Sequence, residues 1–137
     1  MSAAEPTCVF VYGSLMPGRH NAHVARAGGA TFEAAPAWLA GFALLDLQPE
    51  GYPGIVPGTP EQVVHGWLLG YAPADWARVL PHLDELEGLH LRPPMYRREQ
   101  ATVHTEAGPR AAWTYIYAWQ ERLRRAGCTP VPSGRWP

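Results

Sequence analysis

The stretch VFVYGSLMPGRH, Val9 to His20, begins with an apolar alternation that stops at Gly-Ser. This pattern predicts a strand that ends in a tight glycine turn. The free backbone N–H groups of such a turn can receive a carboxylate or a carbonyl oxygen without the help of a charged side chain. The same residues also fit a strand that ends in an ordinary turn with no binding role, and from this stretch alone that is the better interpretation.

Two more specific interpretations of the turn fail. Gly13 and Gly18 have the spacing of the phosphate-binding loop G-x-x-x-x-G-K-[ST], but Arg19 and His20 replace the lysine and the hydroxyl residue of that motif. A nucleophilic Ser14 in a G-x-S-x-G turn would need glycine at the position of Tyr12. We therefore expect neither a nucleotide site nor a covalent serine intermediate.

Composition sets the class of protein. The 137 residues are 47% hydrophobic and 17% charged, with a formal net charge of -1. We expect a single domain over residues 1–137, with a small molecule or a protein as partner, and neither nucleic acid nor a membrane. Cys8 and Cys128 are too few for a disulfide framework, and MSAAEPT has no signal-peptide pattern, so we expect a cytoplasmic protein. The oligomeric state is not readable from the sequence.

Short elements follow one another between scattered prolines and glycines. Alternation predicts strands over residues 8–12, 30–35, 38–46, 63–71, 101–105 and 112–119. Helices are expected over residues 20–27, over 73–87 with an interruption at Pro81, and over 120–126. Many strands with few crossover helices favour an α+β fold. We expect a small mixed, mainly antiparallel β-barrel flanked by a few short helices.

Helical periodicity singles out one carboxylate in PHLDELEG. Leu83, Leu86 and Glu87 fall on one side of the predicted helix, Glu85 points nearly opposite, and Asp84 lies at the flank. Glu87 would thus face inward in the last turn, where burial and the helix dipole both raise the pKa of a carboxyl group. The competing interpretation is a glutamate that frays into solvent beside Gly88.

Other candidate features are weaker. The strand AAWTYIYAW puts four aromatic residues on one face, as core or as tyrosine donors to a ligand, and YPGIVPG either connects elements or borders a pocket. His20 and His23 have a spacing that one metal ion could use, but two solvated histidines fit better, and no metal or other cofactor is expected. The basic run Arg122 to Arg125 is expected to be an exposed helix face.

Several short segments occur in an order that resembles the gamma-glutamylcyclotransferase-like family. The segments are VYGSL (11–15), YPGIV (52–56), VHGWLL (64–69), LDELEG (83–88), YRR (96–98), YIYA (115–118) and SGRW (133–136). The resemblance runs from Val9 to the end of the sequence. The connection from Glu87 to Tyr96, over the loop Gly88 to Met95, is longer than is usual in the family, and it leaves the contribution of this loop to specificity open.

The resemblance implies a small mixed β-barrel with helices and an enzyme that converts gamma-glutamyl amides to 5-oxoproline. It assigns binding of the glutamyl group to Tyr12, Gly13, Ser14 and Leu15, and general acid and base catalysis to Glu87. Tyr117 matches a tyrosine that lines such pockets in the family. A binding module for an acidic amide, without turnover, is the other function that fits. The resemblance does not identify the leaving amine.

Overall fold

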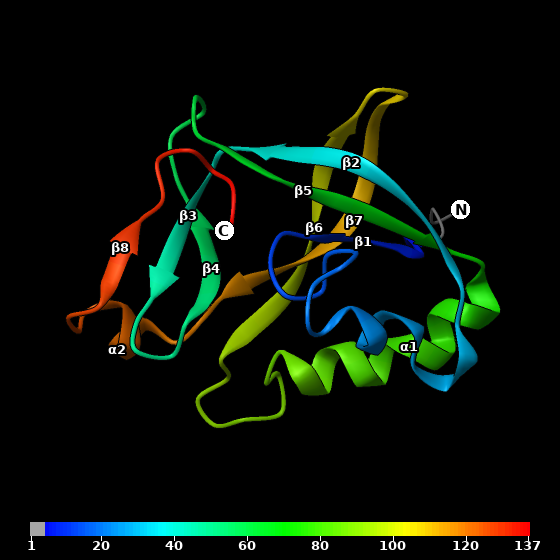
Figure 1. Ribbon diagram of the computed structural model, residues 1–137, viewed down its shortest axis with the longest axis horizontal. Helices are drawn as coiled ribbons and strands as arrows, with labels where there is room; N and C mark the ends of the chain where they lie inside the picture. Colours follow the sequence, from blue (N-terminus) through cyan, green and yellow to red (C-terminus); the bar gives the residue numbers. More distant parts are fainter. Residues whose placement is uncertain (1–4) are drawn as a thin grey trace.

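The computed structural model describes residues 5–137, and five of its strands close into a barrel. Residues 1–4, which belong to the predicted domain and to the segment inspected for a signal peptide, lie outside the described residues. In order around the barrel the strands are β1 (Cys8–Val11), β5 (Val63–Tyr71), β2 (Phe32–Ala40), β6 (Tyr96–Thr105) and β7 (Gly108–Tyr117) (Figure 1).

A parallel seam closes the barrel. β1 pairs with β7 in parallel, with Val9 opposite Trp113, whereas the other neighbouring strands of the barrel are antiparallel. The barrel is therefore mixed and mainly antiparallel, and the expected fold class is confirmed. Because the seam is next to the end of β1, it also places the glycine turn beside β7.

A second, three-stranded sheet lies at one end of the barrel (Figure 1). Its order is β4 (Tyr52–Pro57), β3 (Phe42–Leu47) and β8 (Cys128–Pro130), and both pairings are antiparallel. The prediction of one strand over residues 38–46 is wrong, because Gly41 has a φ of +86° and divides β2 from β3. The connector interpretation of YPGIVPG is also wrong, since residues 52–57 form β4.

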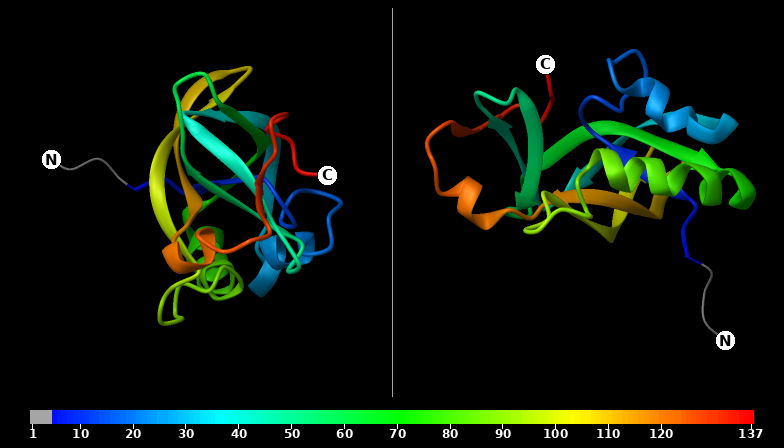
Figure 2. Two further views of the ribbon diagram at one scale, coloured as in Figure 1. Left: turned by 90° about the vertical axis from the view of Figure 1, so that its left-hand side faces the viewer. Right: turned by 90° about the horizontal axis from the view of Figure 1, so that it is seen from below.

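The helices lie against one side of the barrel (Figure 2). They are η1 (Ala22–Gly29, a 3-10 helix) and α1 (Pro73–Leu86); a further short helix, α2 (Gln120–Leu123), precedes β8. The predicted interruption of α1 is wrong, because the helix continues through Pro81. Trp76, Val79 and Leu83 are buried on both sides of that proline along the helix, and their packing outweighs the hydrogen bond that proline removes. Within residues 5–137, no helix combines the length and the apolar character needed to cross a bilayer.

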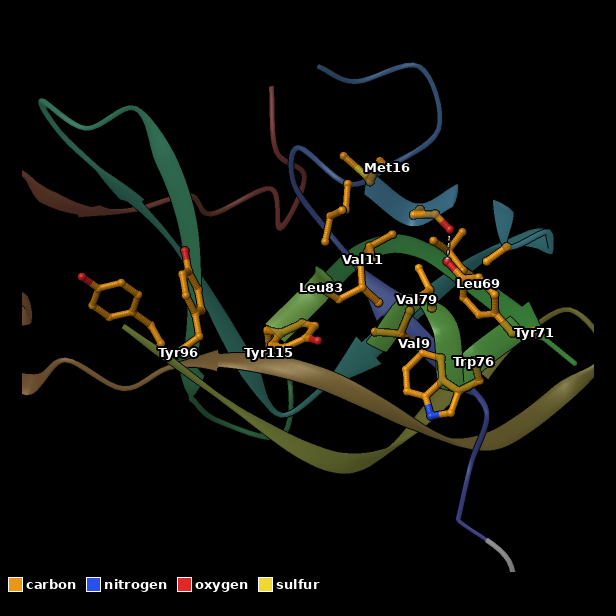
Figure 3. Packing of buried hydrophobic residues seen from close by; sticks show 14 of the residues in the cluster. Val9, Val11, Met16, Leu69, Tyr71, Trp76, Val79, Leu83, Tyr96 and Tyr115 are labelled. Atoms are coloured by element: carbon orange, nitrogen blue, oxygen red, sulfur yellow. Dashed lines mark hydrogen bonds between the residues drawn. The ribbon is translucent and has the colours of Figure 1, made fainter. Parts of the chain in front are cut away.

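Strand β1 is buried on both faces, which explains its continuous apolar sequence. Val9 and Val11 pack with the buried face of α1, as Figure 3 shows for Val79 and Leu83. The alternate residues of β1, including Phe10, belong to a second cluster that fills the barrel. The position of β1 between these two clusters fixes the start of the turn that follows it.

Candidate active site

The turn after β1 is held by hydrogen bonds from both sides. The N–H of Met16 donates to the Gly13 carbonyl at 3.0 Å, and the N–H of Asn21 donates to the Ser14 carbonyl at 3.0 Å. The Asn21 side chain also donates to the Ser14 hydroxyl at 2.9 Å. By contrast, the backbone N–H groups of Gly13, Ser14 and Leu15 have no acceptor among the described residues. The turn therefore presents unused donors in a fixed geometry.

Glu87 lies at the point where α1 ends. The N–H of Gly88 donates to the Glu85 carbonyl at 3.1 Å, and the N–H of Leu89 donates to the Asp84 carbonyl at 3.2 Å. This pair of bonds, with Gly88 at a φ of +70°, is a Schellman cap, which a glycine at this position makes without strain. The cap ends the helix with Glu87 on the side of its buried residue Leu83, so the side chain does not fray into solvent.

The Glu87 carboxyl group occupies an environment that favours its neutral form. Burial first, and the negative charge of Asp84 second, raise the pKa of Glu87 to about 8. The carboxyl group makes no hydrogen bond or ion pair with any of the described residues. A group in this state exchanges a proton readily near neutral pH.

One cavity of about 380 Å³ brings the turn and Glu87 together. Five of the six predicted site residues line it, namely Tyr12, Gly13, Ser14, Leu15 and Glu87. Much of the remaining wall comes from the loop between β3 and β4, the start of β4, the segment after α1, the start of β6, β7 and the C-terminal segment. These parts contribute Glu50, Tyr52, Pro53, Met95, Tyr96, Tyr115 and Trp136.

The structure does not place Tyr117 in this cavity. Its ring packs edge to face on Tyr96, with the ring centres 5.0 Å apart, and it lines a separate hollow with residues of β4 and α2. Gly54 of β4 makes room for it, because a β-carbon there would lie 3.0 Å from Cβ of Tyr117. Tyr115, two residues earlier on the same face of β7, lines the cavity instead.

Three tyrosines of the cavity wall donate hydrogen bonds from their hydroxyl groups to acceptors whose positions are fixed by the fold. Tyr12 donates to the Tyr115 carbonyl at 2.7 Å, Tyr96 to the Pro53 carbonyl, and Tyr115 to Asp84 at 2.7 Å. Burial raises the pKa of each of these phenols, and the negative charge of Glu87 adds to the effect. They are neutral groups with their positions set by the protein.

An ion pair supports the part of the cavity wall that contains Glu50. Arg122 on α2 is buried, and its guanidinium donates to both carboxylate oxygens of Glu50, at 2.6 and 2.8 Å, and to the Gln48 carbonyl at 2.7 Å. This pairing lowers the pKa of Glu50 to about 2. The expected exposed basic face over residues 122–125 is thus wrong for Arg122, which anchors the loop between β3 and β4.

The C-terminal segment completes the cavity. Arg19, which follows the glycine turn, donates to the Pro137 and Trp136 carbonyls. The Gly134 carbonyl accepts the His65 N–H at 2.8 Å, so this segment is fastened to β5 as well. His20 lines the same cavity, but in residues 5–137 no three potential metal-ligating side chains come together.

Several of these wall residues were not predicted from the sequence. Tyr115 was within reach, because alternation along β7 puts it on the same face as Tyr117. Glu50 and Arg122 are 72 residues apart and carry no local motif, so only the fold relates them.

The barrel, the second sheet and the α1 helix define a protein of the gamma-glutamyl cyclotransferase fold. An AIG2-like protein from Mus musculus is similar over 98% of this chain and 97% of its own, with 23% identity and a TM-score of 0.67. A structure named gamma-glutamyl cyclotransferase matches 91% of this chain and 71% of its own, with 23% identity and a TM-score of 0.62. YkqA from Bacillus subtilis matches 94% of this chain with 19% identity and a TM-score of 0.65, and this chain spans 39% of the YkqA length.

Sequence identities at this level show the fold alone, whereas a match to a family model shows the family. The model described as "Gamma-glutamyl cyclotransferase, AIG2-like" matches residues 9–137. The chain therefore belongs to the gamma-glutamyl cyclotransferase, AIG2-like family, whose members are typically cyclotransferases acting on small gamma-glutamyl compounds. A comparison with curated proteins gave no match.

Proposed function

We propose that this protein is a gamma-glutamyl cyclotransferase that converts a gamma-glutamyl amide to 5-oxoproline and a free amine. In this reaction the α-amine of the glutamyl group attacks its own γ-carbonyl carbon. A new carbon–nitrogen bond closes a five-membered ring, and the bond from that carbon to the leaving amine breaks. No water and no external nucleophile is consumed. The protein must fold the substrate, move protons from the attacking nitrogen to the leaving nitrogen, and stabilise an oxyanion.

Glu87 is the proposed proton carrier. Its carboxylate takes a proton from the α-ammonium group, which makes the amine nucleophilic, and delivers this proton to the leaving nitrogen. The ring nitrogen, which is cationic after its attack, then loses a second proton through the same carboxylate, and this proton ends on the released amine. A pKa of about 8 is close to that of an α-amino group, so transfer in both directions is nearly balanced. The single observation that carries the proposal is this carboxyl group in one cavity with the free N–H groups of residues 13–15.

The glycine turn is the proposed binding element for the glutamyl group. The unused N–H groups of Gly13, Ser14 and Leu15 can donate to the γ-carbonyl oxygen as it gains negative charge, or to the α-carboxylate. Preorganised donors of this kind contribute about 10²- to 10³-fold to turnover in other enzymes. The four residues Tyr12 to Leu15 keep their predicted role here, whereas Tyr117 contributes through its packing on Tyr96.

A product assay tests the proposal. The protein is incubated with gamma-glutamyl amino acids, peptides and amines, and 5-oxoproline is followed by mass spectrometry. We expect turnover with at least one compound and a loss of about 100-fold or more in Glu87→Gln. Glu85→Gln is the matched control, because Glu85 is exposed two residues earlier on the other side of α1. Saturable binding without product for every compound would instead identify a binding module.

A further inference from the structure

Asp84 joins three elements around the cavity. Its carboxylate accepts a hydrogen bond from the Tyr115 hydroxyl at 2.7 Å and from Nε of Arg98 at 3.0 Å. Asp84 is on α1, Tyr115 on β7 and Arg98 on β6, so the helix and the two barrel strands meet at this side chain. Arg98 is itself held by Trp113, whose ring centre lies 4.5 Å from the guanidinium carbon.

We propose that Asp84 is a positioning residue for the reaction: held by Arg98, it fixes the Tyr115 phenol in the cavity wall and places a negative charge one helical turn before Glu87. This inference rests on the proposed function of Glu87 as the proton carrier. Asp84 and Arg98 do not line the cavity, so they act through Glu87 and Tyr115.

Asp84 and Arg98 have opposite effects on the proton affinity of Glu87. The carboxylate of Asp84 favours the neutral form of Glu87, in agreement with its contribution to the raised pKa of that group. The guanidinium of Arg98 offsets part of the Asp84 charge, because the two groups form an ion pair. Removing Asp84 should therefore lower the pKa of Glu87, and removing Arg98 should raise it.

The other ionisable groups around Glu87 leave this contrast intact. Tyr12, just after β1, and Tyr96 and Tyr115, on β6 and β7, face it, and burial keeps all three neutral. The charged or titratable side chains elsewhere in the cavity wall are those of Arg19, His20, Glu50 and Tyr52. These side chains are the same in all the variants proposed below, so their effect on the pKa of Glu87 is the same in each variant.

Stability alone cannot distinguish a structural role from a positioning role. The side chains of Arg98 and Asp84 are only 21% and 25% exposed, so losing either partner leaves a largely buried charged or polar group without its hydrogen bond and costs stability. A structural role predicts this loss and no change in how Glu87 titrates. A positioning role predicts shifts of opposite sign.

The test compares Asp84→Asn and Arg98→Gln with two matched controls. Asp75→Asn removes another acidic residue of α1, which pairs with Arg78 near the start of the helix, and Arg97→Gln removes the neighbouring arginine of β6. For each variant, kcat/KM is measured against pH. We expect the acid limb to move down by about 0.5 to 1 pH unit in Asp84→Asn and up in Arg98→Gln, with both controls unchanged.

Direct titration separates this inference from the proposed function. The carboxyl carbon of Glu87 is followed by NMR in protein labelled at glutamate, with Glu87→Gln assigning the signal, and this needs no turnover. Opposite shifts in Asp84→Asn and Arg98→Gln would support the inference even if no compound is cyclised. The same pKa of Glu87 in all folded variants, or shifts of the same sign, would overturn it. If one variant does not fold, the direction of the Glu87 pKa shift in the other variant still decides.

Discussion

Gly13 and Pro53 approach so closely that a β-carbon on Gly13 would lie 2.5 Å from Cγ of Pro53. Gly13 does not have a positive φ, so its requirement for glycine comes from this contact and not from backbone conformation. The contact packs the glycine turn against β4 and therefore joins the barrel to the second sheet at the cavity.

The first prediction concerns this contact. In Gly13→Ala the methyl group must displace the turn or β4, at a cost of about 1 to 3 kcal/mol in unfolding free energy. A displaced turn misplaces its N–H donors, and we expect kcat/KM to fall about 10- to 100-fold. Gly70→Ala on β5 is the control, because the nearest atom to its β-carbon would be 3.9 Å away. Denaturation and the product assay measure both effects; equal activity of the two variants would contradict the role of the contact.

The second prediction is a pH profile for the natural protein. Glu87 must lose its proton before it can accept one from the substrate, and its pKa is about 8. We expect kcat/KM to rise about tenfold per pH unit up to pH 8 and to fall again where the substrate ammonium group loses its own proton. A profile that is flat between pH 6 and 8 would exclude Glu87 as the group that sets the acid limb.

The third prediction separates stability from activity at Glu87. Its pKa is raised in the folded state above the ordinary 4.5, so the folded protein binds this proton more tightly than the unfolded chain. The stability from this linkage is complete below about pH 4.5 and is lost as pH rises through 8. Glu87→Gln should therefore unfold like the natural protein at pH 4.5 but be about 2 to 4 kcal/mol more stable at pH 9. Urea denaturation at the two pH values measures this difference, and an equal effect at both would refute it.

The fourth prediction concerns the ion pair behind the loop between β3 and β4. Arg122→Met leaves Glu50 and the Gln48 carbonyl without their donor, and we expect a loss of about 3 kcal/mol in unfolding free energy. Arg125→Met on the same segment removes an exposed pair with Glu121 and should cost less than about 0.5 kcal/mol. Guanidinium denaturation compares the two variants. Similar losses of unfolding free energy in the two variants would mean that the Arg122–Glu50 pair contributes no more to stability than the exposed Arg125–Glu121 pair.

Local patterns in the sequence were enough for some parts of the fold and not for others. Short apolar runs and alternation of β-prone residues identified β1, β5 and much of β7, because β1 is apolar throughout and the other two strands have apolar faces. The same rule missed β4, since Pro53 and Gly54 are typical of turns, and Gly54 is in fact a strand residue that makes room for Tyr117. Pro81 misled in the same way, because tertiary packing on either side keeps α1 continuous.

Some features of the candidate site could likewise be predicted from local sequence patterns, and others required the fold. The orientation of Glu87 followed from helical periodicity, and the turn at Gly13 from the end of an alternating strand, so both were accessible without a fold. The choice between Tyr115 and Tyr117 was not, because both lie on one face of β7 and only the position of β4 separates them. Asp84 was placed at the flank of the helix, but its bonds to two distant strands depend on the closed barrel.

The parallel seam between β1 and β7 has a consequence for biosynthesis. Tyr12 and Tyr115, which meet beside it, are 103 positions apart in the chain. Contacts between such remote segments form late, since the entropy of closing the intervening loop must be overcome first. A growing chain therefore cannot complete the cavity until β7 has docked beside β1 and the C-terminal segment, with Trp136, has closed the wall.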